Sequence, residues 1–346
     1  MSRAGEAYDA QTRGSNRKFR PIVWDVSMTI EHKGGARVPG PLDFYSGRMG
    51  GGRIPGPLGV KRVAEATPAA SKATKVFKMP APAGGAGVST VHVVASPLFS
   101  DDTPAPTDVV QGRLANCPVA AILAALAHTP NGQKRIHDLV TENKAVVETD
   151  LTDVADKLET VPKGKKCISN RYFCVKLEGK TIEVSDVFYT DDGDRDTWSL
   201  IFMGAPPLGK PGEGPIPGPP KTVWPSAIEK AYAVKVKGYE DLDDDSKHKV
   251  KEFWEVLVGV KPQGFAVDDK TDLDKIRDVA KAASTVPALG ASRDNATGVL
   301  NHHGFAILGI GGSNIELYDP HGRTLNISLK DFRLQFQAVF YGNPRS

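Results

Sequence analysis

Hydrophobic positions along the chain begin to follow regular periods at about residue 87. The stretch "GVSTVHVVASPLF" (87–99) alternates apolar and polar positions, which predicts a strand. The Ala-rich stretch 117–129 predicts a helix that is buried through the middle of a domain, with only its first turn reaching a cleft. A polar helical stretch is expected at about 131–159. It is followed by two strands, "NRYFCVKLEG" and "KTIEVSDVFYT", with Gly179 near the turn.

The C-terminal part of the pattern predicts three helices and then a hairpin. The helices are expected at 224–235, 246–259 and 270–283, after a loop at 204–221 that is too rich in Pro and Gly for regular structure. In "GFAILGIGGSNIELYDPHG" (304–322), two apolar strands flank Gly311-Gly312-Ser313, which is a hairpin signal. The closing "LKDFRLQFQAVFYG" is helix-like or strand-like. Helices come first and strands last, which predicts the α+β class.

Residues 1–88 have a different composition, rich in Gly, Pro, Ala and Lys. They contain two similar segments, "RVPGPLDF" (37–44) and "RIPGPLGV" (53–60). Pro and Gly at this density oppose helix formation, so we expect a largely irregular extension. A linker is one interpretation, and a docking or autoinhibitory segment that lies extended in a groove is the other. The rest, 89–346, is expected to form the folded core.

The charge of the chain is nearly balanced, at +3, but unevenly distributed. Residues 1–85 carry 14 Lys/Arg and six Asp/Glu, so this extension is either a solvated leader or a tail that recruits an acidic partner. The basic residues are scattered and aromatic residues are few, which is unlike a nucleic-acid-binding module. The sequence shows no membrane span and no cleaved signal peptide, and its three cysteines form no disulfide framework. A cytoplasmic protein is expected, or one exported without a cleaved leader.

Cys117 lies where the loop "QGRLAN" becomes the Ala-rich helix. Unpaired backbone N–H groups at a helix start carry partial positive charge, which stabilises a thiolate and makes it more nucleophilic. Pro118 is tolerated in the first turn, because its missing N–H would have no partner there. The alternative is that Cys117 is a packing residue, since free cysteine is among the most buried residue types.

A nucleophilic thiol needs a base, and the base needs a group that orients it. If the hairpin is symmetric about Gly311, His303 lies directly opposite Asp319, within side-chain reach. Alternation then places on the face of this pair four apolar residues, Phe305, Ile307, Ile315 and Leu317. Two other interpretations stay open. One is a structural ion pair between His303 and Asp319. The other is a metal site made by His302, His303, Asp319 and His321.

Gln111 lies six residues before the cysteine. The tetrahedral intermediate of acyl transfer carries an oxyanion, which needs donors that are already in place. The Gln111 side-chain amide and the Cys117 backbone N–H are candidate donors.

Together these segments resemble the calpain-like protease core of the papain-like cysteine proteases. "DVVQGRLANC" (108–117) matches the family's Gln-Gly-x4-Cys pattern, "GVLNHHGFAIL" (298–308) aligns His303 with the family's base, and "YDPHG" places Asp319 at the family's asparagine. "VWPSAIEKAYAVKVKGYEDL" (223–242) follows the family's Trp-x-x-x-Leu-Glu-Lys-Ala-Tyr-Ala helix. The resemblance spans about residues 90–346. Asp319 replaces Asn, while His321 and Pro118 each replace a Trp.

The resemblance implies a two-lobed fold, with a mainly helical lobe at about 89–210 that carries Gln111 and Cys117 and a β-rich lobe within about 221–346 that carries His303 and Asp319. It implies a cysteine endopeptidase, whose triad is Cys117, His303 and Asp319, acting on an extended protein segment through a thioester. No cofactor is needed for the chemistry. Calcium is a candidate activator, with Asp108 matching one family ligand.

Three alternatives stay open: a glutamine deamidase, an acyltransferase with the same triad, and an inactive calpain-like binding module. The protein substrate is the one partner that the resemblance implies. A delivered effector or toxin and an internal regulatory protease fit the sequence equally well.

Overall fold

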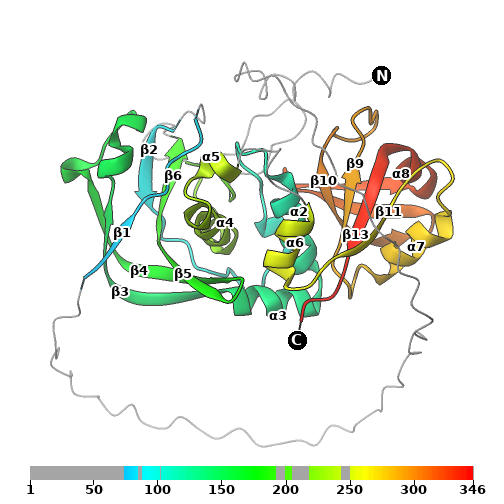
Figure 1. Ribbon diagram of the computed structural model, residues 1–346, viewed down its shortest axis with the longest axis horizontal. Coiled ribbons are helices and arrows are strands. Elements are labelled where there is room, and N and C mark those ends of the chain that lie inside the picture. Colours follow the sequence, from blue (N-terminus) through cyan, green and yellow to red (C-terminus); the bar gives the residue numbers. More distant parts are fainter. Residues whose placement is uncertain are drawn as a thin grey trace, which may run out of the picture. The chain divides into compact units, whose positions relative to one another are not determined.

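The computed structural model describes residues 74–84, 88–101, 103–191, 199–204, 218–242 and 250–345. The two similar segments at 37–44 and 53–60, and most of the expected loop at 204–221, lie outside these residues. The described part is a mixed α+β structure (Figure 1), which confirms the predicted class. None of its helices is both long enough and apolar enough to cross a bilayer.

Three sheets make up the β structure of the described residues. The first has the order β1-β3-β4-β5, with bounds Lys75–Lys78, Val140–Asp150, Lys166–Leu177 and Lys180–Ser185. The second has the order β2-β6-β7, with bounds Thr90–Val93, Val187–Asp191 and Ser199–Leu200. The third has the order β12-β11-β10-β9-β13-β8, with bounds Arg323–Ser328, Asn314–Asp319, Gly304–Gly311, Ala288–Ser292, Phe336–Tyr341 and Gln263–Ala266.

The helices follow the sequence patterns more closely than the strands do. The α-helices are α2 (Cys117–His128), α3 (Pro130–Leu139), α4 (Trp224–Lys235), α5 (Tyr239–Leu242), α6 (Val250–Val258), α7 (Leu273–Ala282) and α8 (Leu329–Gln335). Short 3-10 helices are η1 (Pro106–Asp108), η2 (Thr152–Lys157) and η3 (Lys163–Lys165). The predicted helices at 117–129, 224–235 and 270–283 are confirmed within a few residues. The closing segment "LKDFRLQFQAVFYG", which was expected to be helix-like or strand-like, contains a helix and a strand, since α8 leads directly into β13.

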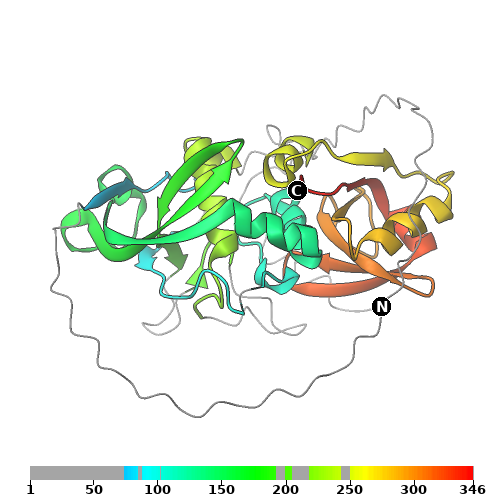
Figure 2. The ribbon, with the colours of Figure 1, turned by 90° about the horizontal axis from the view of Figure 1, so that it is seen from below.

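Helix α2 is buried from Cys117 to Ala127, as its apolar composition predicts. It contacts α3 and α6 as well as strands β9 and β10, so it lies between helices and the six-stranded sheet (Figures 1 and 2). At its end, Thr129 terminates α2 and also caps α3, because its Oγ1 accepts a hydrogen bond from Gly132 N at 3.1 Å. This arrangement places the first turn of α2 next to the sheet.

Two sequence predictions about the region after α2 are wrong. The polar helical stretch expected at 131–159 ends at Leu139, and the chain continues as β3. From Glu142 to Val147, exposed side chains alternate with packed ones, which is a strand pattern at the edge of a core. The run "KTIEVSDVFYT" is also two strands rather than one. It divides at Asp186, with β5 and β6 in different sheets.

The expected lobes also need correction. Between residues 89 and 210 the described elements include only two α-helices, α2 and α3, and more strand than helix, so "mainly helical" does not describe this segment. Its helical partners come from later in the chain, where α4 packs on β3, β4 and β5. Regular structure also begins before residue 88. Strand β1 pairs in parallel with β3, and Met79 and Ala83 are buried.

The hairpin of β10 and β11 forms as predicted, but its register differs. Gly311 pairs with Asn314, so the turn is the two-residue loop Gly312-Ser313 rather than a turn centred on Gly311. A bulge between Ile307 and Gly309 then shifts the pairing by one residue. Continued to the end of the strands, this register sets Asp319 opposite Phe305. His303 is therefore a diagonal neighbour of Asp319, which a histidine side chain can still reach.

The predicted apolar face of this hairpin is correct despite the shifted register. Phe305, Ile307, Ile315 and Leu317 all lie in one buried cluster with α7, α8 and β13. The end of the hairpin that carries His303 and Asp319 is continuous with this cluster, since the His303 ring meets the Phe305 ring edge-on at 4.8 Å.

Candidate active site

The thiol of Cys117 is placed by the start of α2. Cys117 is the first residue of this helix, Asn116 is its N-cap, and Pro118 follows in the first turn. Val119 N and Ala120 N both donate to Asn116 O, at 2.9 and 3.3 Å, which closes the first turn. Cys117 is 4% exposed, so its side chain faces the protein rather than open solvent.

The residues on both sides of His303 lie close to the first turn of α2. The Cys117 sulfur lies 3.8 Å from the carbonyl oxygen of His302. Gly304, on the other side, lies so close to α2 that an added Cβ would be 3.3 Å from both Cys117 O and Ala121 Cβ. A glycine at the start of β10 therefore lets the strand approach the first turn of α2 closely. The structure thus brings the backbone on both sides of His303 next to the first turn of α2, which begins 186 positions earlier in the sequence.

The backbone of His303 is fixed by Ser292 at the end of β9. His303 N donates to Ser292 Oγ at 2.9 Å, and Ser292 N donates to His303 O at 2.9 Å. His302, just before it, has a positive φ of 48°. The chain therefore turns sharply before His303 and enters the sheet immediately after it.

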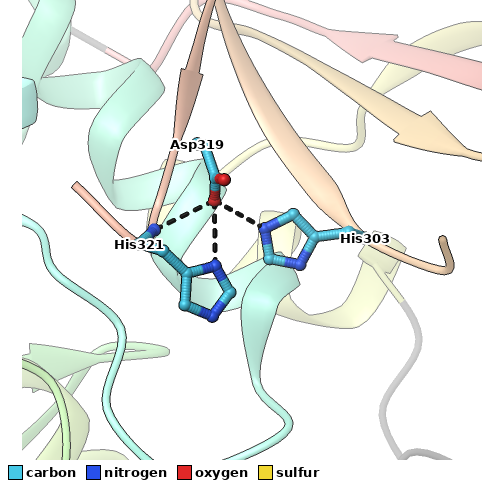
Figure 3. Close-up of side chains that lie close together, drawn as sticks. All are labelled: His303, Asp319 and His321. Atoms are coloured by element: carbon cyan, nitrogen blue, oxygen red, sulfur yellow. Dashed lines mark hydrogen bonds and ion pairs between the residues drawn. The ribbon is translucent and has the colours of Figure 1, made fainter. Parts of the chain in front are cut away.

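The His303 imidazole is bound to Asp319 through one defined nitrogen. Nε2 lies 3.0 Å from Asp319 Oδ1, and both side chains are buried (Figure 3). Burial lowers the pKa of His303, and although the hydrogen bond and charge of Asp319 raise it, the pKa stays below its ordinary value. With Nε2 donating to the carboxylate, a neutral imidazole carries its lone pair at Nδ1, where it can accept a proton.

Asp319 accepts three hydrogen bonds at a single oxygen. Besides His303 Nε2, the donors are His321 N at 3.0 Å and His321 Nδ1 at 2.9 Å (Figure 3). Burial alone would raise the pKa of Asp319, but the bonds from His303 and His321 outweigh it, and this pKa lies well below its usual range. Asp319 is therefore a buried carboxylate. The His303 and His321 rings stack 4.9 Å apart, so His321 covers one side of the pair.

Gln111 lies on a segment that is held on both sides. Its backbone N donates to Pro320 O at 2.8 Å, next to Asp319. On the other side Arg113 N donates to Ile201 O at 2.8 Å, and an added Cβ at Gly112 would come within 2.1 Å of that same oxygen. The Gly of the Gln-Gly pair is thus required by a close backbone approach.

The side chain of Gln111 points toward the loop that leads into Cys117. Nε2 donates to Leu114 O at 2.6 Å, and Oε1 is buried without a hydrogen-bond partner. The Gln111 amide therefore has one further N–H beyond the bond to Leu114.

Sequence reasoning missed a buried contact just behind Cys117. Asn116 does not cap α2 with its side chain; its Nδ2 donates instead to Glu229 Oε1 at 2.6 Å. Glu229 Oε2 accepts from Met203 N at 2.8 Å, and the carboxyl group is fully buried in α4. Burial raises the pKa of Glu229 to about 7, although both hydrogen bonds favour the charged form. The adjacent Glu–Lys in an otherwise apolar helix was the available signal.

Lys230, the residue after Glu229 in α4, is buried as well. Its Nζ donates to Ser185 O and Oγ, both at 3.0 Å, and to Val187 O at 2.5 Å. Burial lowers the pKa of Lys230 to about 7. Lys230 thus joins α4 to the point where β5 ends and β6 begins.

The structure places the expected calcium ligand, Asp108, in a structural contact. Its Oδ2 accepts from Trp224 Nε1 at 3.0 Å and from Ala105 N at 2.9 Å, which ties η1 to α4. Within the described part of the chain, one group of three potential metal-ligating side chains occurs: His303, Asp319 and His321. Asp108 is not in it. Of the four residues of the alternative metal site, His302 also lies outside this group, with its Nδ1 3.1 Å from Asp294 Oδ1.

The other two cysteines lie away from this constellation, on β4. Burial raises the pKa of Cys167, and burial together with the Glu183 charge raises that of Cys174. None of the three cysteines, all of which lie in the described part of the chain, forms a disulfide. A scan against protein-family models found no family that matches this chain, and a search of curated proteins found no matching relative.

Proposed function

We propose that this protein is a cysteine endopeptidase with a calpain-like core, which hydrolyses peptide bonds in extended protein segments. The observation that carries the proposal is the meeting of α2 and β10. A thiol at a helix start lies 3.8 Å from the carbonyl oxygen of His302, and the residue on the other side of His303, Gly304, lies close to the backbone of the same helix turn. The Nε2 of His303 is in turn bound to a buried carboxylate. Thiol, base and orienting group in this order are the elements of nucleophilic catalysis by cysteine.

In the proposed reaction His303 Nδ1 takes the proton of the Cys117 thiol, and the sulfur attacks the scissile carbonyl carbon. The oxyanion that forms accepts hydrogen bonds from Cys117 N and Gln111 Nε2. His303 then gives its proton to the leaving nitrogen, the C–N bond breaks, and a thioester remains. Water, deprotonated by His303, hydrolyses the thioester and restores the thiol. Asp319 holds His303 with Nε2 protonated throughout.

Three features support the individual roles. The bond from His303 Nε2 to Asp319 leaves Nδ1 as the proton acceptor. The start of α2 supplies partial positive charge where the thiolate and the oxyanion form. Gln111 is held beside both Pro320 and the loop before Cys117 by backbone and side-chain bonds. The extended shape of the substrate follows from the resemblance to calpain-like proteases.

Terminal mapping of a protein mixture tests the proposed reaction. Incubation with wild type is expected to create new N- and C-termini within substrate proteins, while Cys117→Ala creates none and Cys167→Ala behaves like wild type. The assay is run with and without calcium. A mass gain of about one unit at glutamine residues, without new termini, would instead identify deamidation by the same groups. If neither new termini nor deamidation depends on Cys117, the result contradicts an enzymatic function.

A further inference from the structure

His321 adds a second imidazole to the His303–Asp319 pair and makes it a compact set of metal ligands. One ligand atom from each of His303, Asp319 and His321 lies within 4.8 Å of the other two. Asp319 Oδ1 lies 3.0 Å from His303 Nε2 and 2.9 Å from His321 Nδ1 (Figure 3). Tetrahedral zinc with bonds of 2.0–2.2 Å requires ligand atoms about 3.3 Å apart. Small movements would therefore open room for an ion.

The ligand types favour a transition metal over calcium. Two imidazoles and one carboxylate suit Zn²⁺ and its neighbours, whereas Ca²⁺ takes six to eight oxygen ligands. Three protein ligands leave one position for water. The carboxylate of Asp319 supplies the negative charge, and its Oδ1 accepts three N–H hydrogen bonds from His303 and His321. His303 and Asp319 side chains are 7% and 6% exposed, but that of His321 is 22% exposed, so an ion has a route from solvent.

We propose that a divalent transition metal of the Zn²⁺ class binds to His303 Nε2, the Asp319 carboxylate and His321 Nδ1, and that this binding switches the active site off. Metal binding itself does not depend on the catalytic role of Cys117. The inhibitory consequence rests on the proposed peptidase function.

Inhibition follows from the tautomer of His303. In the metal-free state the Nε2 proton is donated to Asp319, and Nδ1 has the lone pair. A metal at Nε2 uses the Nε2 lone pair, so the one ring proton of the neutral imidazole must move to Nδ1 through solvent. Nδ1 then has no lone pair to accept the Cys117 proton. No redox step is involved, and a chelator reverses the change.

Zn²⁺ binding is measured by calorimetric titration of the metal-free full chain carrying Cys117→Ala, which excludes the thiol as a ligand. One Zn²⁺ site is expected, and its affinity should fall by at least roughly 100-fold when His321→Phe is added. The reason is that loss of even a residue that only hydrogen-bonds a ligand lowers metal affinity about 10–100-fold. Phenylalanine retains the ring stacked on His303. The matched control is His302→Asn, which removes the adjacent histidine and should leave Zn²⁺ affinity unchanged. Asparagine also tolerates the positive φ of this residue.

Equal Zn²⁺ affinity and stoichiometry with and without His321 would overturn the metal site. His321→Gln, which keeps a polar group beside Asp319, is the second variant in case the phenylalanine variant misfolds. In wild type, hydrolysis of a labelled unfolded protein should stop at Zn²⁺ concentrations near the measured Kd, and His321→Phe should need about 100-fold more. Inhibition of both proteins at the same concentration would overturn the regulatory role. If wild type hydrolyses no protein even without metal, the result contradicts the proposed function. The calorimetric titration would still decide whether the metal site exists.

Discussion

Replacing Asp319 with alanine is expected to reduce kcat/KM for peptide hydrolysis by roughly 10²–10⁴-fold. The reason is that Asp319 is the acceptor for His303 Nε2 and fixes which ring nitrogen carries the proton. Without it, the imidazole is free to adopt the tautomer with hydrogen on Nδ1, which cannot act as the base. Steady-state kinetics on a cleaved peptide, once terminal mapping has supplied a sequence, measures the loss.

Asp319→Asn is the matched variant, because asparagine keeps an oxygen at the position that accepts from His303. It should retain activity within about tenfold of wild type but shift the pH profile. Asp319 raises the pKa of His303 through its hydrogen bond and charge, against the lowering by burial. Activity is lost as pH falls through the His303 pKa, since a protonated imidazole accepts no proton. Removing the charge lowers this pKa, so the acid limb of kcat/KM should move to lower pH. This role of Asp319 would be contradicted if the acid limb of kcat/KM stayed at the same pH in Asp319→Asn. It would also be contradicted if Asp319→Ala were as active as Asp319→Asn.

Glu229→Gln is expected to stabilise the protein at alkaline pH relative to wild type. In wild type the folded-state pKa of Glu229 is about 7, above its ordinary value of 4.5. A group whose pKa is raised by folding contributes fully to the unfolding free energy at pH values below its unfolded-state pKa. This contribution is lost as the pH rises through its folded-state pKa. Between pH 5 and pH 8, wild type should therefore lose roughly 2–3 kcal/mol of unfolding free energy through this group alone.

The glutamine side chain resembles the protonated form of Glu229. Its amide can donate to Asn116 Oδ1, which is buried without a hydrogen-bond partner, while its oxygen accepts from Met203 N. Urea unfolding at pH 5 and pH 8 measures the difference between the two proteins, in which all other titrating groups cancel. Glu240→Gln, at an exposed position, is the control. A difference that does not grow with pH would contradict burial of an ionisable carboxyl group behind Cys117.

Sequence reasoning indicated which residues of this candidate site lie near one another better than it indicated their geometry. The helix at Cys117 and the apolar face of the hairpin followed from periodicity, because both are buried elements with consistent patterns. The register did not follow, because the turn is formed by Gly312-Ser313 and is not centred on Gly311. In addition, a bulge after Ile307 cannot be seen in an apolar run of small and branched residues. His303 and Asp319 meet nevertheless, because a histidine side chain spans the diagonal distance.

Other features depended on tertiary contacts that a single sequence does not encode locally. The segment after Leu139 has enough polar residues for a surface helix, but pairing with β1 and β4 makes it a strand. The contact between Asn116 and Glu229 joins residues 113 positions apart. His321 was recognised as a possible metal ligand and as a substitution for a tryptophan, but not as a hydrogen-bond donor to Asp319. Its bond to Asp319 requires the turn after β11, in which His321 N and Nδ1 reach the same oxygen.

The most direct test of the account is the alkylation rate of each cysteine by iodoacetamide, measured by peptide mass spectrometry in wild type and in His303→Ala. At pH 7, Cys117 is expected to react at least about tenfold faster than Cys167 and Cys174, whose pKa values are raised by burial. This advantage should disappear in His303→Ala, because the thiol has lost its base. If Cys117 reacts no faster than the other two cysteines, or if its rate does not change without His303, then the two residues do not act together as a nucleophile and its base.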